Sequence, residues 1–291
     1  MAGESVETTL ELWASSLRDV KARIRPLFSQ ERVAVSAGKF LDGLLGNEPR
    51  KTGWMRAEAA GDSGPWRQQA ILGRGRWDAD VLRDIVGEYA LDTLADQTAV
   101  LVIDETGFLK QGKASCGVAR QYTGSAGKIT NCQIGVFASY VSRHGHAFID
   151  RALYLPKEWA TDRTRRRKAG VPKEVTFKTK PVIAFEQLRW ACAAGLPRGV
   201  VLMDAGYGTD TDLRTSITTL GLSYVAGIQP QTSVWAPGTG PQPPKNWSGH
   251  GRPPKLLRRD GKHQPISVKK VALGLLENCA LLICRRSNAD Q

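Results

Sequence analysis

The sequence has few cysteines, no long apolar run and no basic, apolar segment at its N-terminus. Its five cysteines are scattered and odd in number, which argues against a disulfide framework or a zinc site. The longest apolar runs, such as residues 99–103 and 199–203, are far too short to span a bilayer. Because acids stand where a signal peptide has basic residues, we expect a cytoplasmic, nucleoid-associated protein without a membrane partner.

The basic residues are concentrated in one part of the chain. The 291 residues include 41 Lys and Arg against 28 Asp and Glu, a net charge of +13. Residues 1–100 contain 13 basic and 15 acidic residues, whereas residues 101–291 contain 28 basic and 13 acidic ones. Such a local excess of positive charge in a folded chain predicts a polyanionic partner, of which nucleic acid is the commonest. The alternative is a basic surface that only maintains solubility.

The first hundred residues are predicted to be all-helical. Apolar periodicity and helix-forming residues predict helices over residues 8–24, 31–46, 54–60, 66–72 and 77–93. The third and fourth of these helices are joined by the turn GDSGP and are similar to a helix-turn-helix, whose second helix enters the DNA major groove. In that interpretation Trp66, Arg67 and Gln68 face the bases. Most tryptophans, Trp54 and Trp66 among them, fall in or beside helical segments, where packing is the simpler expectation.

From Thr98 the pattern changes to short apolar runs. They predict strands over residues 99–103, 132–142, 146–156, 199–204 and 222–228, with helices over 180–195 and 209–221. Three strands followed by alternating helices and strands predict an α/β fold, a mixed sheet flanked by helices in the order of an RNase H-like core. Residues 230–265 are rich in Pro, Gly and basic residues and predict a loop or insertion, whereas residues 266–276 predict a final strand.

Two aspartates directly follow buried strands of this predicted sheet. Asp104 follows the strand in LVIDETG, and Asp204 follows the strand in VVLMDAGYG. Ligands bind at the carboxyl ends of strands in open α/β sheets, so the two carboxylates would converge there if their strands are neighbours. Facing carboxylates repel each other unless a cation lies between them, and their oxygens suit Mg²⁺ or Mn²⁺ rather than zinc. Alternatively, each aspartate is only a turn or cap residue, or Glu105 is the metal ligand.

This pair of carboxylates indicates phosphodiester chemistry. Two divalent ions about 3.5–4 Å apart can activate a water or a 3′-hydroxyl and stabilise the leaving oxygen. Gly107 follows one aspartate, and Gly206 and Gly208 follow the other. Residues without a side chain let a phosphate backbone approach closely. The basic part of the chain would bind the polyanionic substrate.

Several separate motifs of the sequence resemble one known family. The segments LVIDETGFLKQGKASCGVARQYTGSAGKITNCQIGVFASY, IDRALYLPKEW, VTFKTKP and VLMDAGYG resemble, in this order, the DDE-type transposases of bacterial insertion sequences. The resemblance extends over residues 33–275. It implies an RNase H-like catalytic domain behind a helical DNA-binding region and an Asp-Asp-Glu triad that holds a divalent metal. It also implies a homodimer that nicks and transfers double-stranded DNA at terminal inverted repeats, with Asp104 and Asp204 as the first two acids.

The third acid of the triad is not identifiable in the sequence. Glu277 is the only glutamate after Asp204, and the sequence departs from the family pattern after about Leu275. We therefore expect a C-terminally truncated copy in which Glu277 is not a ligand and two carboxylates bind the metal more weakly. Two other functions stay open. The chain could only bind DNA and compete for element ends, or it could be an RNase H-like nuclease that cleaves RNA–DNA hybrids.

Four parts and two basic segments complete these predictions. Residues 1–97 are predicted to form a helical DNA-binding domain and residues 98–229 an RNase H-like catalytic core. Residues 230–265 are predicted to form a basic loop, and residues 266–291 the truncated end of the catalytic domain. The run TRRRK either contacts phosphates or is a solvated surface, and GHGRPPKLLRR resembles a minor-groove hook or is a solvated loop. The candidate DNA-binding residues are Arg67, Arg165, Arg166, Arg167, Lys168, Arg252 and Lys255.

Overall fold

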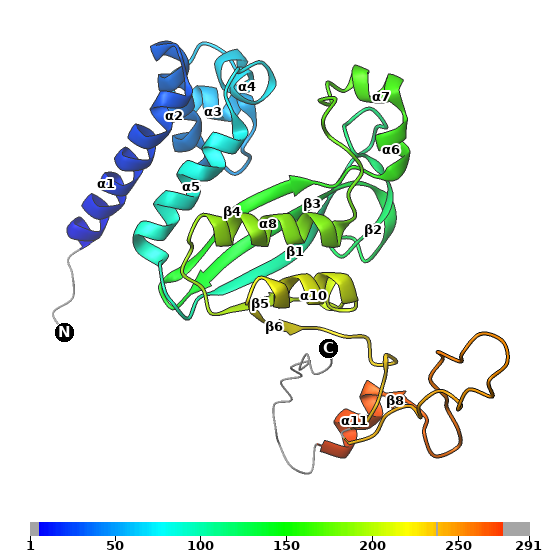
Figure 1. Cartoon of the computed structure of the whole chain (residues 1–291). Coiled ribbons are helices and arrows are strands. Elements are labelled where there is room, and N and C mark those ends of the chain that lie inside the picture. The colour runs from blue at the N-terminus through cyan, green and yellow to red at the C-terminus, as the bar shows by residue number, and fades with distance from the viewer. Residues whose placement is uncertain (1–5, 237, 276–291) are drawn as a thin grey trace. The chain divides into compact units, whose positions relative to one another are not determined.

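The computed structural model describes residues 6–236 and 238–275. Contacts between residues divide the chain into two compact units. The first unit combines the residues up to 96 with residues 139–150, and the second combines residues 97–138 with those from 151 onward. The first unit is mainly helical, and the second contains most of a β-sheet together with the helices beside it (Figure 1).

The described residues of the first unit form the five helices that the sequence predicts. These are α1 (Val6–Ile24), α2 (Glu31–Leu45), α3 (Gly53–Ala59), α4 (Trp66–Gly73) and α5 (Ala79–Leu94), with a short 3-10 helix η1 (Arg25–Leu27) after the first. Side chains fix two of the starts. Thr52 Oγ1 accepts a hydrogen bond from the Met55 amide at 3.2 Å, and Asp78 Oδ1 accepts one from the Asp80 amide at 2.8 Å. Such caps satisfy amides that have no partner within the helix.

The core of this helical unit lies between α2 and α4. Phe28, Ala37, Phe40 and Ile71 are buried there, with Trp77 partly buried against them. The indole nitrogen of Trp77 donates a hydrogen bond to the carbonyl oxygen of Ile71 at 2.8 Å, so its polar atom has a partner inside the packed region. Val33 and Phe40 of the apolar stripe predicted for residues 31–46 therefore pack, whereas Leu44 of that stripe is 43% exposed.

A buried carboxylate fixes the turn between α3 and α4. Asp62 accepts a hydrogen bond from Gln68 Nε2 at 3.1 Å and pairs with Arg67 at 3.2 Å and Lys39 at 3.5 Å. The hydrogen bond from Gln68 and the charges of the two cations lower the pKa of Asp62 below its ordinary value, although burial opposes this. Gln68 is completely buried, so the prediction that it faces DNA bases is wrong.

The sheet contains six strands in the described part of the chain. They are β1 (Val100–Leu109), β2 (Ala119–Thr123), β3 (Lys128–Ser142), β4 (Gly145–Leu153), β5 (Val200–Met203) and β6 (Ser223–Ala226). Five of them were predicted, and β2 was not. Strand β2 has the sequence ARQYT, in which only Thr123 is buried, so it lacks the apolar alternation that identifies a strand.

The strand order is that of an RNase H-like core. Strand β1 lies between β3 and β5, β6 follows β5, and both β2 and β4 pair with β3. The pairs β1–β5 and β5–β6 are parallel, whereas β2–β3 is antiparallel. Strands β3 and β4 are joined by a two-residue turn, which only antiparallel neighbours can use. The predicted fold class, a mixed sheet flanked by helices and preceded by a helical region, is confirmed.

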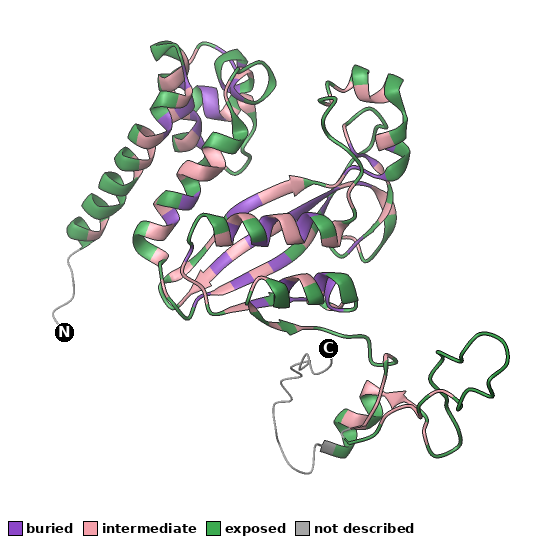
Figure 2. Cartoon of the chain, viewed as in Figure 1, coloured by how far each residue is buried: buried purple, intermediate pink, exposed green. Residues whose placement is uncertain are grey.

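Two helices bury one face of the parallel strands. Buried residues are Leu101 and Ile103 of β1, Val201 and Met203 of β5, Ile183 and Leu188 of α8 (Lys180–Ala193), and Leu213 and Ile217 of α10 (Thr211–Thr219). Residues of the opposite face are more exposed, as Leu202 at 40% and Val225 at 50% illustrate. Figure 2 shows this alternation along the strands. The short helix α9 (Ala205–Gly208) connects β5 to α10.

The remaining elements differ from the sequence-based expectation. Two short helices, α6 (Lys157–Thr161) and α7 (Arg163–Lys168), follow β4 and were not predicted. The strand predicted over residues 266–276 is wrong. Strand β8 (Ile266–Ser267) has two residues and pairs with β7 (Ser233–Val234), and helix α11 (Val268–Leu275) follows at once. None of the helices that the structure describes is long and apolar enough to cross a membrane.

Candidate active site

Asp104 and Asp204 lie next to each other in the register of the sheet. Strands β1 and β5 are parallel neighbours, and their last paired residues are Ile103 and Met203. Asp204 directly follows β5, whereas Asp104 lies within β1, level with the carboxyl end of β5. Paired positions of parallel strands point to the same face. The strands are therefore neighbours, as the convergence of the two carboxylates requires.

Asp204 is a helix cap as well as a candidate ligand. Its Oδ1 accepts hydrogen bonds from the amides of Gly206 at 2.8 Å and Tyr207 at 3.3 Å. These bonds fix the orientation of the carboxylate at the start of α9, while the residue stays exposed. The cap interpretation and the ligand interpretation are compatible, because a carboxylate has a second oxygen.

Asp104 is held more loosely than Asp204. Its Oδ1 accepts a hydrogen bond from the neighbouring Glu105 amide at 2.7 Å, and the residue is exposed. No other hydrogen bond to this carboxylate comes from the residues that the structure describes. Its second oxygen is thus free to bind an exogenous group.

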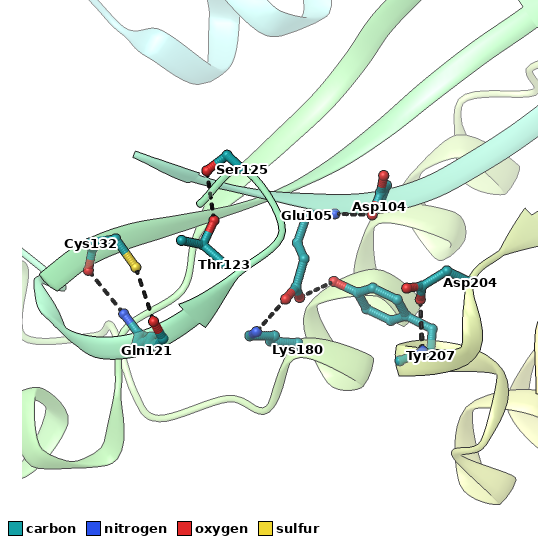
Figure 3. Close-up of polar contacts among 10 residues, drawn as sticks. Asp104, Glu105, Gln121, Thr123, Ser125, Cys132, Lys180, Asp204 and Tyr207 are labelled. Carbon is teal, nitrogen blue, oxygen red and sulfur yellow. Dashed lines mark hydrogen bonds and ion pairs between the residues drawn. The ribbon is translucent and has the colours of Figure 1, made fainter. Parts of the chain in front are cut away.

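Glu105 points away from Asp104, since successive side chains of a strand alternate between faces. Its Oε1 pairs with Lys180 Nζ at 2.5 Å, and its Oε2 accepts a hydrogen bond from the Tyr207 hydroxyl at 3.0 Å (Figure 3). Both oxygens have partners, so Glu105 is not the free ligand that the alternative interpretation of the sequence requires. Sequence reasoning missed Lys180 and Tyr207, although both lie in the motifs VTFKTKP and VLMDAGYG.

The hydroxyl of Tyr207 stays protonated at this site. Burial raises the pKa of Tyr207 far above its ordinary value, and the negative charge of Glu105, together with those of Asp104 and Asp204, raises it further. A protonated phenol is a hydrogen-bond donor, which is the role that the contact with Glu105 requires.

The donor set suits a magnesium ion held by two carboxylates. Within the described ranges, no group of three or more His, Cys, Asp or Glu side chains could hold a metal ion. Magnesium, however, is commonly held by one or two carboxylates, with waters and substrate phosphates completing its shell. Asp104 and Asp204 provide such a pair, and their exposure leaves space for the other ligands. Glu277 lies outside the described residues.

Two of the candidate DNA-binding arginines have a structural role. The guanidinium of Arg165 stacks on the Trp159 ring at 3.8 Å and donates to the Lys113 carbonyl at 2.9 Å. Arg166 donates to the carbonyls of Pro172 at 2.8 Å and Val175 at 2.6 Å. The run TRRRK is therefore neither wholly solvated nor wholly available to phosphates.

Other candidate contact residues are exposed. Arg167, Lys168, Arg252 and Lys255 are exposed, as is Arg67, which also pairs with Asp62. The packing role expected for Trp54 and Trp66 is wrong, because these residues are 63% and 67% exposed. The two rings contact each other instead, with centroids 6.3 Å apart.

Comparison with known protein families assigns this chain to one of them. The sequence model of the DDE superfamily endonucleases matches residues 25–285. The "Probable transposase for insertion sequence element IS701" of Microchaete diplosiphon is 29% identical over 208 residues, which cover 70% of this chain and 51% of that protein. The chain thus spans about half the length of this relative.

Two solved structures are also similar. The Drosophila P element transposase strand transfer complex matches with a TM-score of 0.29 and 14% identity, covering 70% of this chain and 42% of that chain. The Mos1 strand transfer complex matches with a TM-score of 0.24 and 16% identity, covering 67% of this chain and 59% of that chain. Since the family model matches most of the sequence, this chain belongs to the DDE superfamily endonucleases.

Proposed function

We propose that this chain is a transposase that cleaves and transfers DNA strands at the ends of an insertion sequence. The observation that carries the proposal is the parallel pairing of β1 with β5, which sets Asp104 beside Asp204 in an endonuclease family. The similarity to a transposase of an insertion sequence element supports this choice among DNA-cleaving reactions.

Asp104 and Asp204 would hold Mg²⁺ or Mn²⁺. When bound, such an ion polarises a phosphodiester and activates the attacking water or 3′-hydroxyl. The cap at α9 fixes the Asp204 carboxylate before substrate arrives, which reduces the ordering required on binding. Lys180 and Tyr207 hold Glu105 on the other face of β1, so that a third carboxylate does not repel the phosphate.

The proposed partner is double-stranded DNA, at the terminal inverted repeats and at the target. The excess of positive charge after residue 100 supports this partner. We assign DNA binding to the helical residues 1–97 and catalysis to residues 98–229. A homodimer is proposed by analogy, since joining two element ends requires two active sites.

A nicking assay on a terminal-repeat duplex with Mg²⁺ or Mn²⁺ tests this function. Asp104→Asn and Asp204→Asn should each reduce cleavage about a hundredfold or more, because each removes an ionised ligand. Asp212→Asn is the matched control, since Asp212 is an exposed acid on α10 outside the site and should leave cleavage unchanged. Equal cleavage by all three variants would contradict the roles of Asp104 and Asp204.

A chain that only binds DNA is the second candidate function. It is favoured by the presence of two carboxylates, rather than three, at the site within the described residues. The same assay decides between the two, because this candidate predicts retained duplex binding with no turnover in either metal. Cleavage of an RNA–DNA hybrid in preference to duplex DNA would instead support an RNase H-like nuclease.

A further inference from the structure

The helical unit contains a cavity of about 470 Å³ between α2 and α4, well away in sequence from Asp104 and Asp204. Buried Phe28 and Ile71, together with Val33, give it an apolar part. Its volume falls in the range of about 300–1,000 Å³ that small-molecule sites occupy. It is large enough for one nucleotide and too small for a duplex.

Four arginines line this cavity, and no acidic residue does. They are Arg32, Arg67, Arg74 and Arg76. Arg67 pairs with Asp62, but the other three form no ion pair with any residue that the structure describes. These three arginines are exposed, so solvent screens their mutual repulsion, and an anion at the cavity would reduce it further. Arginine forks match the geometry of phosphate oxygens particularly well.

The start of α2 adds to this positive potential. Gln30, the residue before the helix, lines the cavity, and its side chain makes no capping hydrogen bond. The Val33 amide donates to the Gln30 carbonyl oxygen at 3.0 Å, which leaves the Glu31 and Arg32 amides at the start of this 15-residue helix without a side-chain acceptor from the cap. A phosphate at the cavity could accept from them.

Trp66 gives the same cavity an aromatic surface that is held in place. Its ring is 67% exposed and lines the cavity. Gly64 lies against the ring so closely that a Cβ atom there would be 2.0 Å from it, and Trp54 contacts it with an interplanar angle of 58°. An exposed tryptophan fixed by its neighbours is suited to stacking, because little side-chain entropy is lost on binding.

We propose that this cavity receives one unstacked nucleotide of a DNA strand, with its base against Trp66 and its phosphate among the arginines. Phosphate contacts alone would need neither an apolar lining nor an exposed aromatic ring. A purely apolar ligand would need no arginines. A nucleoside phosphate combines both properties, and DNA as its source rests on the proposed function.

Binding to two labelled duplexes tests the proposal with the full chain and without added metal. One duplex is fully paired, and the other has a single unpaired 2-aminopurine nucleotide. The wild-type chain should bind the second about tenfold more tightly and quench its fluorescence, since stacking on an aromatic residue contributes about that factor or more. Trp66→Ala should abolish this preference, so that the variant binds the two duplexes with equal affinity.

Three further variants separate stacking from charge and from loss of folding. Trp13→Ala removes a tryptophan that is 69% exposed on α1 and does not line the cavity, so the preference should persist. Gly64→Ala keeps every aromatic and charged group but displaces the Trp66 ring, so the preference should fall. Arg74→Gln should weaken binding of both duplexes. Thermal unfolding by circular dichroism shows which variants are folded.

The outcomes are distinguishable from failure of the proposed function. Equal binding of the two duplexes by the wild-type chain, or equal effects of Trp66→Ala and Trp13→Ala, would overturn the cavity proposal alone. Absence of binding to either duplex would overturn both proposals. Deoxyadenosine monophosphate is the competitor that tests the source. If it binds in a Trp66-dependent manner while the unpaired nucleotide gives no advantage, the ligand is a free nucleotide and the DNA proposal is wrong.

Discussion

At the residue scale, the contacts of Glu105 decide how the two aspartates can act. Glu105 reaches Lys180 across 75 positions of sequence and Tyr207 across 102. Its side chain and that of Lys180 are 27% and 28% exposed, so the two charges are partly shielded from solvent and attract each other more strongly than exposed charges would. The pair holds a carboxylate that would otherwise add negative charge beside Asp104. We regard Lys180 as a positioning residue for this reason.

Replacing Lys180 by glutamine should destabilise the fold by about 1–2 kcal/mol. The change leaves a half-buried carboxylate with only the Tyr207 hydroxyl as partner. The expected loss of stability lies between the loss for breaking an exposed ion pair and the loss for breaking a buried one. Lys178→Gln is the matched control, because its pair with Glu186 is more exposed, at 42% and 37%. It should cost less than about 0.5 kcal/mol. Urea unfolding of both variants measures the difference, and equal losses would contradict the role given to Lys180.

The sequence predicted the neighbouring positions of Asp104 and Asp204 but not the contacts around them. Each aspartate follows a short apolar run, and that local pattern is visible in a single segment. The contact of Glu105 with Lys180 and Tyr207 depends on three distant segments and has no local signal. Gln68 was missed for a different reason: its partner Asp62 is only six residues away, but a polar residue at a helix start gives no sign in the sequence that it is buried.

At the element scale, α9 fits its place only because Gly208 has no side chain. A Cβ atom at Gly208 would lie 2.0 Å from the carbonyl oxygen of Gly227, just after β6. The obstacle is backbone, which cannot rotate away as a side chain can. This glycine therefore serves the packing of α9, and not only the approach of a phosphate that the sequence suggested.

Gly208→Ala should destabilise the protein by about 1–3 kcal/mol, as overpacking of a close contact does. It should also reduce DNA cleavage under the proposed function, since α9 carries the amides that orient Asp204. Gly112→Ala is the matched control, because nothing lies within 4 Å of a Cβ there. Differential scanning calorimetry compares the two variants. Similar melting temperatures would show that α9 adapts to the added methyl group.

The elements that sequence reasoning found are those with an apolar period. Strand β1 was predicted to end near Ile103 but continues to Leu109. The residues after the aspartate are mostly exposed, so they lack the apolar run by which the sequence identifies a buried strand. Residues 266–276 were predicted as a strand, although Val268 and Val271, three residues apart, also fit one turn of a helix. Short segments of this kind have the pattern of either element, and tertiary contacts decide between them.

At the scale of the whole molecule, the charge distribution supports a nucleic-acid partner only through the cations that remain available. Arg165 and Arg166 are engaged with carbonyl oxygens and the Trp159 ring, so they contribute to the fold. Arg167 and Lys168, the next two residues of the same run, are exposed. Net charge alone therefore overestimates the number of phosphate contacts, and the sequence could not separate the two kinds of arginine.

The affinity for duplex DNA should fall steeply as salt increases. Each neutralised phosphate contributes about −0.9 to the slope of log K against log salt, so five contacts would give a slope of about −4.5. Arg167→Gln should make this slope less steep by about 1 and leave the melting temperature unchanged. Arg165→Gln should lower the melting temperature instead, because it removes a stacked, hydrogen-bonded guanidinium. Titrations between 50 and 200 mM salt measure the slope, and a value near zero would contradict phosphate-dominated binding, since released counterions are its physical signature.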